Sequence, residues 1–184
     1  MNEVLKAIKE RRRIRAYEPT QISKEELDVI IEAGIYAPSG HNSQPWHFTV
    51  VQNREVIEEI NKAAKQVMAT FEVDFIRELG LNPEFDISYK APTIIIVSGR
   101  KDAVSSRSDC DAATQNMLLA AQSLNIGSVW VGFAAFAFMI DGMAQKLGIP
   151  EDYEPYQGVV LGYKKPGLEV PVPKRNYNVV TYIR

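Results

Sequence analysis

The chain has few of the residues from which disulfides and metal sites are built. Its 184 residues include one cysteine, Cys110, and two histidines, His41 and His47. A single cysteine excludes an internal disulfide and fits a reducing cytoplasm, which is the location we expect. Two histidines and one cysteine are too few for a typical protein-built zinc or iron site, so no metal is expected. Cys110 stands between Asp109 and Asp111, whose negative charges disfavour a thiolate nucleophile.

Long apolar runs and an excess of one charge are also missing. The formal net charge is −2, which gives no general reason to expect nucleic acid or an anionic membrane as a partner. The longest apolar run, residues 129–140, is well short of the roughly 20 residues that span a bilayer. The N-terminus is charged throughout and lacks the apolar core of a signal peptide. These features predict a soluble protein.

The length and uniform composition predict a single domain over residues 1–184. Helices are predicted over residues 2–11, after the Ser23–Glu26 capping box, after Asn53, over 109–124 and near 138–147. Strands are predicted at His47–Gln52, Pro92–Ser98, Ser128–Val131 and Gln157–Tyr163. This mixture lacks a regular βαβ alternation, which predicts an α+β fold.

Two segments fit this pattern less well. Residues 70–89 are irregular, although Phe71, Phe75 and Leu79 recur at helical spacing and predict a partly helical segment. The tail from Val170 to Arg184 alternates prolines with β-forming residues. A tail of this composition needs a sheet edge to pair with, its own or that of a neighbouring chain.

The decamer Ala37–Trp46 (APSGHNSQPW) combines two prolines with serine, asparagine and glutamine side chains. The prolines fix the backbone and remove donors, so the segment is predicted to be a rigid loop. Such a loop can present polar groups to a ligand. A purely structural turn closed by a buried Trp46 is the alternative interpretation.

Arginines are concentrated at the end of the first predicted helix: Arg11, Arg12, Arg13 and Arg15. Cations at this position complement the helix dipole, and a polybasic segment can also contact nucleic acid, although the net negative charge speaks against it. The third interpretation is an anion pocket, since the planar guanidinium group suits bidentate phosphate recognition. A second basic pair, Lys174–Arg175, would form the other side of a phosphate clamp.

Taken in order, these motifs resemble those of the nitroreductase family, which are FMN-dependent oxidoreductases. That family carries an R-x-S-x-R/K motif, an APSxxNxQPW segment, a helix with D-x-x-x-x-x-Q-N, a glycine-bearing turn and a basic pair near the C-terminus. This chain has matching residues over 10–184: Arg11, Arg13 and Arg15, the decamer, Asp109 with Gln115–Asn116, the turn Trp130–Gly132, and Lys174–Arg175. Arg13 departs from the pattern, because the family usually has serine there, and the hydroxyl contact to the flavin is lost.

The resemblance implies a set of cofactor-binding residues. The phosphate and pyrimidine side of FMN would be lined by Arg11, Arg12, Arg13, Arg15, Lys174 and Arg175. The partner subunit would bring Pro38, Ser39, Gly40 and Asn42 to the ring edge, and Trp130, Val131 and Gly132 would place backbone near flavin N5. On the substrate side would lie His41, Phe71 and Phe75. Within residues 66–92, Lys90 is the one candidate for the flavin N1 and O2 side. No catalytic side chain is implied, because FMN carries the chemistry.

The resemblance also implies an architecture and an activity. We expect a central, mostly antiparallel sheet surrounded by helices, with the C-terminal strand exchanged in an intertwined homodimer. NADH or NADPH would reduce FMN through N5, and a nitroaromatic or quinone acceptor would then be reduced in a ping-pong reaction. The chain has no G-x-G-x-x-G motif, so no Rossmann site for the donor is expected.

Two alternatives to this activity remain. One is a non-catalytic flavin-binding module for sensing or storage. The other is a specialised dehalogenase or oxidase with a dedicated substrate. Residues 70–89 are too short for an elaborate lid, which favours the generalist reductase.

Overall fold

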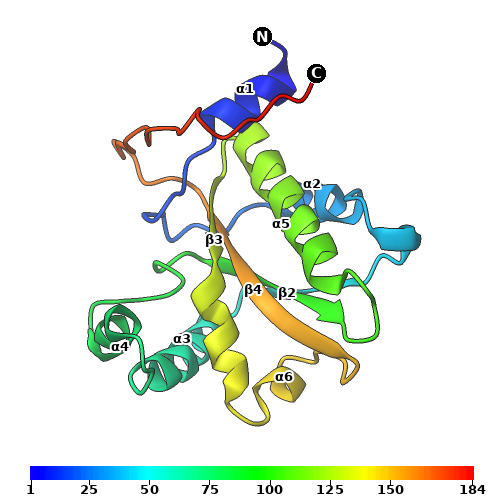
Figure 1. Ribbon diagram of the computed structural model, residues 1–184. Coiled ribbons are helices and arrows are strands. Elements are labelled where there is room, and N and C mark those ends of the chain that lie inside the picture. The colour runs from blue at the N-terminus through cyan, green and yellow to red at the C-terminus, as the bar shows by residue number, and fades with distance from the viewer.

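Four antiparallel strands form the centre of the protein, which a computed structural model describes over residues 1–184 (Figure 1). Their order across the sheet is β1, β2, β4, β3, with bounds Trp46–Val51, Thr93–Arg100, Tyr153–Gly162 and Gly127–Val131 respectively. The central strand β2 is buried from Thr93 to Gly99. Its alternate side chains enter two separate hydrophobic clusters, so the sheet is covered on both faces. The sequence prediction of a buried strand at Pro92–Ser98 is confirmed.

Helices cover the two faces of the sheet. The chain forms α1 (Glu3–Glu10), α2 (Lys24–Ile35), α3 (Arg54–Met68), α4 (Asp74–Leu81), α5 (Ser106–Ser123) and α6 (Met143–Lys146), with 3₁₀ helices η1 (Gly40–Asn42) and η2 (Gly132–Met139). α2 and α5 contribute to the hydrophobic cluster on one face, and α3 and η2 to the cluster on the other. This arrangement is the predicted α+β class. No helix is long and apolar enough to cross a lipid bilayer.

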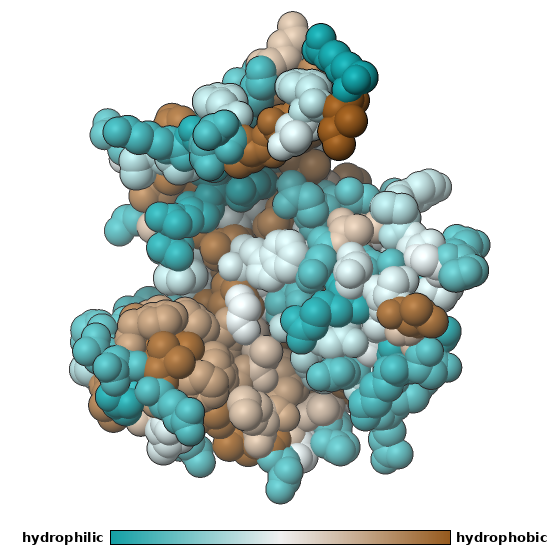
Figure 2. All heavy atoms as spheres, viewed as in Figure 1, coloured by the Kyte–Doolittle hydropathy of each residue, from teal (hydrophilic) through white to brown (hydrophobic).

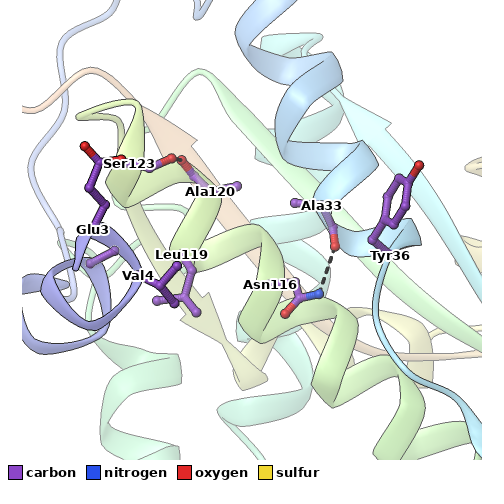
Figure 3. A pocket seen from close by; sticks show the side chains of 9 residues that line it. Glu3, Val4, Ala33, Tyr36, Asn116, Leu119, Ala120 and Ser123 are labelled. Atoms are coloured by element: carbon purple, nitrogen blue, oxygen red, sulfur yellow. Dashed lines mark hydrogen bonds between the residues drawn. The ribbon is translucent and has the colours of Figure 1, made fainter.

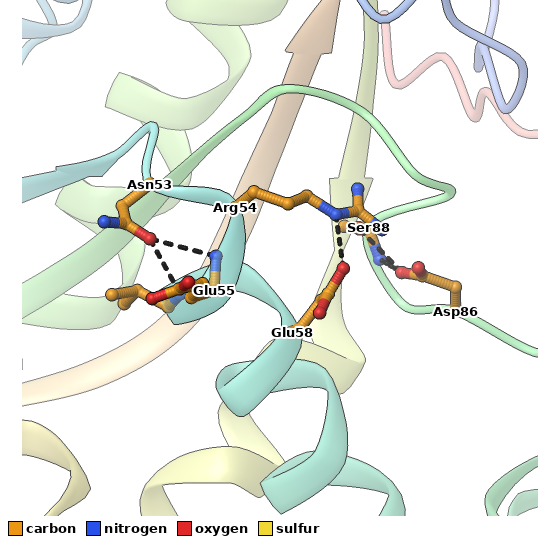
Figure 4. A network of polar contacts seen from close by, with 7 residues as sticks. Asn53, Arg54, Glu55, Glu58, Asp86 and Ser88 are labelled. Atoms are coloured by element: carbon orange, nitrogen blue, oxygen red, sulfur yellow. Dashed lines mark hydrogen bonds and ion pairs between the residues drawn. The ribbon is translucent and has the colours of Figure 1, made fainter.

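Local capping signals fix the starts of α2 and α3, as the sequence predicted. The Ser23 hydroxyl accepts a hydrogen bond from the Glu26 N–H at 3.2 Å, and the Glu26 carboxylate accepts one from the Ser23 N–H at 2.9 Å. At the start of α3 the Asn53 side-chain oxygen accepts hydrogen bonds from the backbone N–H groups of Glu55 and Val56 (Figure 4). Caps of this kind stabilise a helix by about 1 kcal/mol each.

One detail of the predicted helices is wrong. The helix expected near residues 138–147 is divided, because Gly142 adopts a left-handed backbone with φ +82° and leaves only the four-residue α6. The partly helical segment expected within residues 70–89 is confirmed, since Phe75 and Leu79 lie on α4. α4 begins at Asp74, so Phe71 lies before the helix, and its backbone N–H instead bonds the last turn of α3 at Met68.

The C-terminal tail has no regular secondary structure within this chain. Figure 1 shows it passing beside α1, so that the two termini lie near each other. Its apolar side chains are exposed, among them Tyr177 at 87% and Ile183 at 97%. The tail therefore pairs with no edge of its own sheet, and pairing with a neighbouring chain stays a prediction.

Candidate functional site

The arginine cluster of residues 11–15 and Arg175 from the C-terminal basic pair line one cavity of about 600 Å³. It is lined by Arg11, Arg12, Arg13, Arg15, Ala16, Leu168, Val170, Pro171, Pro173 and Arg175. None of its five guanidinium groups forms an ion pair with a carboxylate, since the five ion pairs of the structure lie elsewhere. A dense group of arginines without acidic partners has the charge and the donor geometry to bind a phosphate.

Main-chain pairing positions the arginine-bearing segment. The Ile14 N–H donates a 3.0 Å hydrogen bond to the carbonyl oxygen of Ser128 in β3, and Tyr17 forms an isolated bridge with Lys164 beyond β4. The Ile14 side chain is buried. Side chains alternate in an extended segment, so the exposed Arg13 and Arg15 point away from the core on either side of Ile14.

Two of the arginines are partly engaged by the fold. Arg12 donates from Nη1 to the carbonyl oxygens of Lys9 and Arg11, at 2.8 and 2.9 Å, and so closes the C-terminus of α1. Of the four clustered arginines, only Arg12 therefore interacts with the C-terminus of α1 as the helix-dipole interpretation predicted. The Arg15 guanidinium lies over the Tyr89 ring, 5.2 Å from its centroid, a distance suited to a cation–π contact.

Arg11 and Arg175 form the electrostatic centre of the cavity. Burial lowers the pKa of Arg11, and the positive charges of Arg175 and then Arg12 lower it further. Two like charges held together in this way favour an anion between them. Arg13 lines the same cavity but is exposed. Lys174 is exposed and is not part of the lining, so of the predicted basic pair only Arg175 faces the cavity.

The predicted turn Trp130–Gly132 continues β3 away from the arginines. β3 is an edge strand, so one side of its backbone is unpaired beyond Ser128. The Trp130 side chain is 38% exposed between two buried valines. At Gly132 no atom lies within 4 Å of the position that a Cβ would take, and this glycine lines a second cavity of about 330 Å³. An exposed indole and open backbone thus lie along β3 beyond Ser128, outside the lining of the arginine cavity.

The decamer loop lies at the opposite end of α5 from the arginines (Figure 1). At the start of α5 the Asp109 carboxylate accepts a 3.1 Å hydrogen bond from the Gly40 N–H and a 2.9 Å hydrogen bond from the Ser105 hydroxyl. α1, which leads into the arginine segment, packs near the other end of this 18-residue helix, and a helix of that length spans about 27 Å. One chain therefore does not bring the loop to its own arginine cavity.

The loop is strained and tied internally. His41, Asn42 and Gln44 have positive φ angles of 53°, 53° and 44°, each costing roughly 1–3 kcal/mol in non-glycine residues. The Ser39 hydroxyl accepts from the Gln44 N–H at 3.1 Å, and the Asn42 side-chain oxygen accepts from Gln44 Nε2 at 3.2 Å. His41 and Asn42 are exposed, and Trp46 is only half-buried. Strain of this kind is typical of loops that bind ligands.

An aromatic cluster reaches the arginine cavity through Tyr89, and most of its members were not predicted from the sequence. Phe71 packs edge-on against Phe136 with centroids 4.9 Å apart. The cluster continues through Phe133, Phe85 and Tyr89, whose ring lies beneath Arg15. Figure 2 shows the apolar surface over α4 and η2 at the lower left. The one sequence feature that could have indicated this cluster is the spacing of Phe133 and Phe136, which are three residues apart in the apolar run.

The three predicted substrate-side residues do not meet within one chain. Phe75 is 57% exposed on α4, and Phe71 lies just before that helix. His41 belongs to the decamer loop, on the opposite side of the molecule in Figure 1. Lys90 is exposed with φ 60° and lines a different hollow with Gln21, so it does not join the arginine cavity.

An apolar groove of about 420 Å³ runs between α1, α2 and α5 (Figure 3). Val4 and Tyr36 line it and are 65% and 79% exposed. Asn116, in the predicted Gln115–Asn116 pair, donates a 3.0 Å hydrogen bond to the Ala33 carbonyl and ties α5 to α2. α1 has no buried residue although one side is apolar, and an exposed apolar surface of this kind is suited to contact another protein surface.

Cys110 offers no competing chemistry. Its side chain is buried, and burial, followed by the charges of Asp111 and Asp109, raises its pKa to about 12. The thiol is therefore protonated and unreactive at neutral pH. The structure brings together no three histidine, cysteine, aspartate or glutamate side chains suited to hold a metal ion.

The chain is similar in sequence and in structure to known flavin-dependent reductases. The sequence profile of the Nitroreductase family matches residues 8–163. A putative NADH dehydrogenase/NAD(P)H nitroreductase of Archaeoglobus fulgidus is 37% identical over 167 residues, covering 90% of this chain and 87% of the relative. An FMN reductase [NAD(P)H] of Bacillus subtilis is 30% identical over 183 residues, covering 91% and 71%. A crystal structure of a Bacteroides fragilis nitroreductase with bound FMN superimposes with a TM-score of 0.92 at 37% identity, covering 100% of both chains.

Proposed function

Because this chain belongs to the nitroreductase family, we propose that it binds FMN and reduces electron-poor acceptors, such as nitroaromatics or quinones, with electrons from NADH or NADPH. The observation that carries the proposal is the convergence of five arginines without carboxylate partners, from both ends of the chain, on one cavity beside an edge strand. Bound FMN would supply the redox chemistry by taking a hydride from the donor and passing electrons to the acceptor.

The arginine cavity fits the phosphate end of the cofactor. Arg11 and Arg175 are close enough for their charges to interact, and a phosphate between them removes that repulsion while accepting charge-assisted hydrogen bonds. Arg15 contributes from its place over Tyr89 toward the pyrimidine side. Arg12 has Nη1 engaged at the end of α1, so it offers fewer donors. Lys174 adds positive charge next to Arg175 from outside the cavity.

The edge of β3 fits the ring system. From Ser128 the strand leads away from the arginines along Trp130 and Val131 to the open space at Gly132. A planar aromatic group can lie against this unpaired backbone edge, because the edge offers N–H donors and carbonyl acceptors that no other strand uses. The exposed Trp130 indole would form part of its wall.

The remaining residues of the site come, in this proposal, from a second copy of the chain. Pro38, Ser39, Gly40 and Asn42 are held in a rigid loop that its own chain directs away from its arginine cavity. The groove between α1, α2 and α5 and the exposed tail give the dimer its apolar contacts. In a two-fold dimer the tail adds a strand to the partner's sheet, and each cofactor lies between both chains.

The acceptor site is also assembled between the two chains. The aromatic cluster that begins at Phe71 and the exposed Phe75 offer stacking surfaces for a planar acceptor. The partner's loop would bring the exposed imidazole of His41 to the open side of the ring. The protons that the acceptor takes up together with the electrons can come from solvent, so no side chain is required to supply them, and the redox step itself belongs to the cofactor.

Steady-state oxidation of NADH and NADPH tests the proposal. The flavin-loaded protein should oxidise one or both donors and should do so faster when menadione or a nitroaromatic is added. Parallel lines in a double-reciprocal plot against donor and acceptor would support ping-pong transfer. A protein that retains FMN but oxidises neither donor with any acceptor would be a flavin-binding module instead.

A further inference from the structure

Arg15 is the one arginine of the cavity whose guanidinium group lies on an aromatic ring. Its Cζ atom is 5.2 Å from the centroid of the Tyr89 ring, a distance typical of a cation–π contact. Arg15 forms no ion pair, and its side chain is otherwise exposed to solvent. The face of the Tyr89 ring is therefore what holds this positive charge in place.

The backbone that carries the Tyr89 ring is itself fixed. Tyr89 and Lys90 both have positive φ angles, 53° and 60°, a conformation that non-glycine residues keep only where the surrounding structure imposes it. The Tyr89 N–H donates a 3.0 Å hydrogen bond to the Asp86 carbonyl oxygen. Ile87, between them, is buried, and its N–H donates to the Asn61 side-chain oxygen in α3 at 3.0 Å. Tyr89 is thus a rigid platform rather than a mobile cover for Arg15.

Tyr89 also connects Arg15 to the end of β3 along which the flavin ring system is proposed to lie. The Tyr89 ring packs edge-on against Phe85, with centroids 6.4 Å apart, and Phe85 packs edge-on against Phe133 at 6.1 Å. Phe133 directly follows Gly132 in the sequence. None of the other four arginines of the cavity has an aromatic contact. Arg15 therefore stands apart from them, on the side of the cavity that the aromatic cluster reaches.

We propose that Tyr89 is a positioning residue, which holds the Arg15 guanidinium group beside the pyrimidine edge of the flavin and thereby makes the bound cofactor easier to reduce. The inference rests on the proposed function, because it takes the ligand of the cavity to be FMN. Reduction adds negative charge to the pyrimidine part of the ring system, and a cation fixed near it stabilises the reduced form more than the oxidised form. Released from Tyr89, the exposed Arg15 side chain would spread its charge into solvent. Residues 66–92 contribute to the site through Tyr89 and not through Lys90, which lines a different hollow.

The test compares Tyr89→Leu and Tyr89→Phe with the parent protein. Leucine removes the aromatic face, whereas phenylalanine keeps it. Tyr153→Leu is the matched control, because Tyr153 packs against the same hydrophobic cluster as Tyr89 but lies beside His47 and does not line the cavity. For each protein the dissociation constants of oxidised FMN and, without oxygen, of reduced FMN are measured by titration. The midpoint potential of the bound flavin reports the ratio of the two constants independently.

Tyr89→Leu should weaken the binding of reduced FMN about fivefold more than that of oxidised FMN, as expected for the loss of a cation–π contact. The midpoint potential should become more negative accordingly. Tyr89→Phe and Tyr153→Leu should keep the ratio of the two dissociation constants within twofold of the parent. Arg15→Gln should show the same selective loss, and Tyr89→Leu added to Arg15→Gln should change the ratio no further, since both act through one contact.

A second variant keeps the ring at position 89 and tests the contact even if Tyr89→Leu lowers the stability of the fold. A trifluorinated phenylalanine placed there retains the shape of phenylalanine, but its fluorine atoms withdraw the negative charge from the face of the ring that attracts a cation. Relative to Tyr89→Phe, this variant should show the selective loss of reduced FMN binding with little change in thermal stability.

Three results would overturn the proposal. An unchanged ratio of dissociation constants in both Tyr89→Leu and the fluorinated variant would make Tyr89 a structural residue only. Equal weakening of oxidised and reduced FMN would show that its effect does not reach the ring system. A loss from Tyr89→Leu that is as large in the Arg15→Gln background as in the parent would show that Tyr89 does not act through Arg15. Failure of the proposed function looks different, because the parent protein would then bind FMN in neither form.

Discussion

Arg11 and Arg175, from opposite ends of the chain, line one cavity, and after burial the charge of Arg175 is the largest cause that lowers the pKa of Arg11. Such a pair is unfavourable unless an anion lies between the two groups. The tail residues that carry Arg175 are held in no sheet of their own chain. We therefore expect ligand binding to couple the two ends of the chain.

Replacing Arg175 by alanine should weaken FMN binding by more than tenfold. A charge-assisted contact to a phosphate contributes about 1.5–3 kcal/mol, and Arg11 alone cannot replace a two-sided clamp. Fluorescence titration of the flavin-free protein with FMN gives the dissociation constant. Lys165→Ala, which removes a neighbouring charge outside the cavity, should bind FMN like the parent. Equal flavin retention by Arg175→Ala after dialysis would make Arg175 an ordinary surface charge.

Replacing Gly40 by alanine should disturb the decamer loop. A Cβ at this position would stand 2.3 Å from the Ser105 hydroxyl oxygen, and overpacking of this kind costs about 1–3 kcal/mol. Thermal unfolding should show the loss of stability, and FMN should dissociate faster because the loop is expected to contact the flavin of the partner.

The double variant Gly40→Ala/Ser105→Ala supplies the control for the Gly40 prediction. It removes the clashing oxygen, after which the Ser105 Cβ is the nearest atom at 3.4 Å, an ordinary contact. Relative to Ser105→Ala, the added alanine should then cost little. If it costs as much in both backgrounds, the clash is not the cause.

Deleting residues 176–184 should weaken the dimer and release FMN together. The tail exposes Tyr177, Val179 and Tyr182 in a single chain, and in the proposed dimer these side chains are covered by the partner. Analytical ultracentrifugation and flavin absorbance follow the two losses separately. A truncated protein that stays dimeric and yellow, or a full-length protein that sediments as a monomer, would contradict the crossed-over tail.

Short-range signals were sufficient to predict most of the fold. The Ser23–Glu26 box and the Asn53 cap act within three residues, so they depend little on the rest of the chain. The continuous β-branched run that forms β2 was sufficient to predict a strand buried on both faces. The break at Gly142 was missed because an apolar run at helical spacing does not reveal a left-handed residue that ends the helix.

The site was less predictable, because its contacts join distant parts of the chain. The hydrogen bond from the Gly40 N–H to Asp109 and the stacking of Arg15 on Tyr89 leave no local sequence pattern. Arg175 lines the cavity and Lys174 does not. This difference depends on the path of the tail past α1. Contacts between two chains depend on an assembly that a single sequence does not specify.

The absorbance spectrum of the purified protein tests the central claim most directly. If the arginines from both ends of the chain bind one phosphate, the protein should be yellow, with flavin bands and roughly one FMN per chain after release and quantification. The spectrum requires no knowledge of the acceptor or of the preferred donor. A colourless protein that takes up no FMN when the cofactor is added would contradict the account.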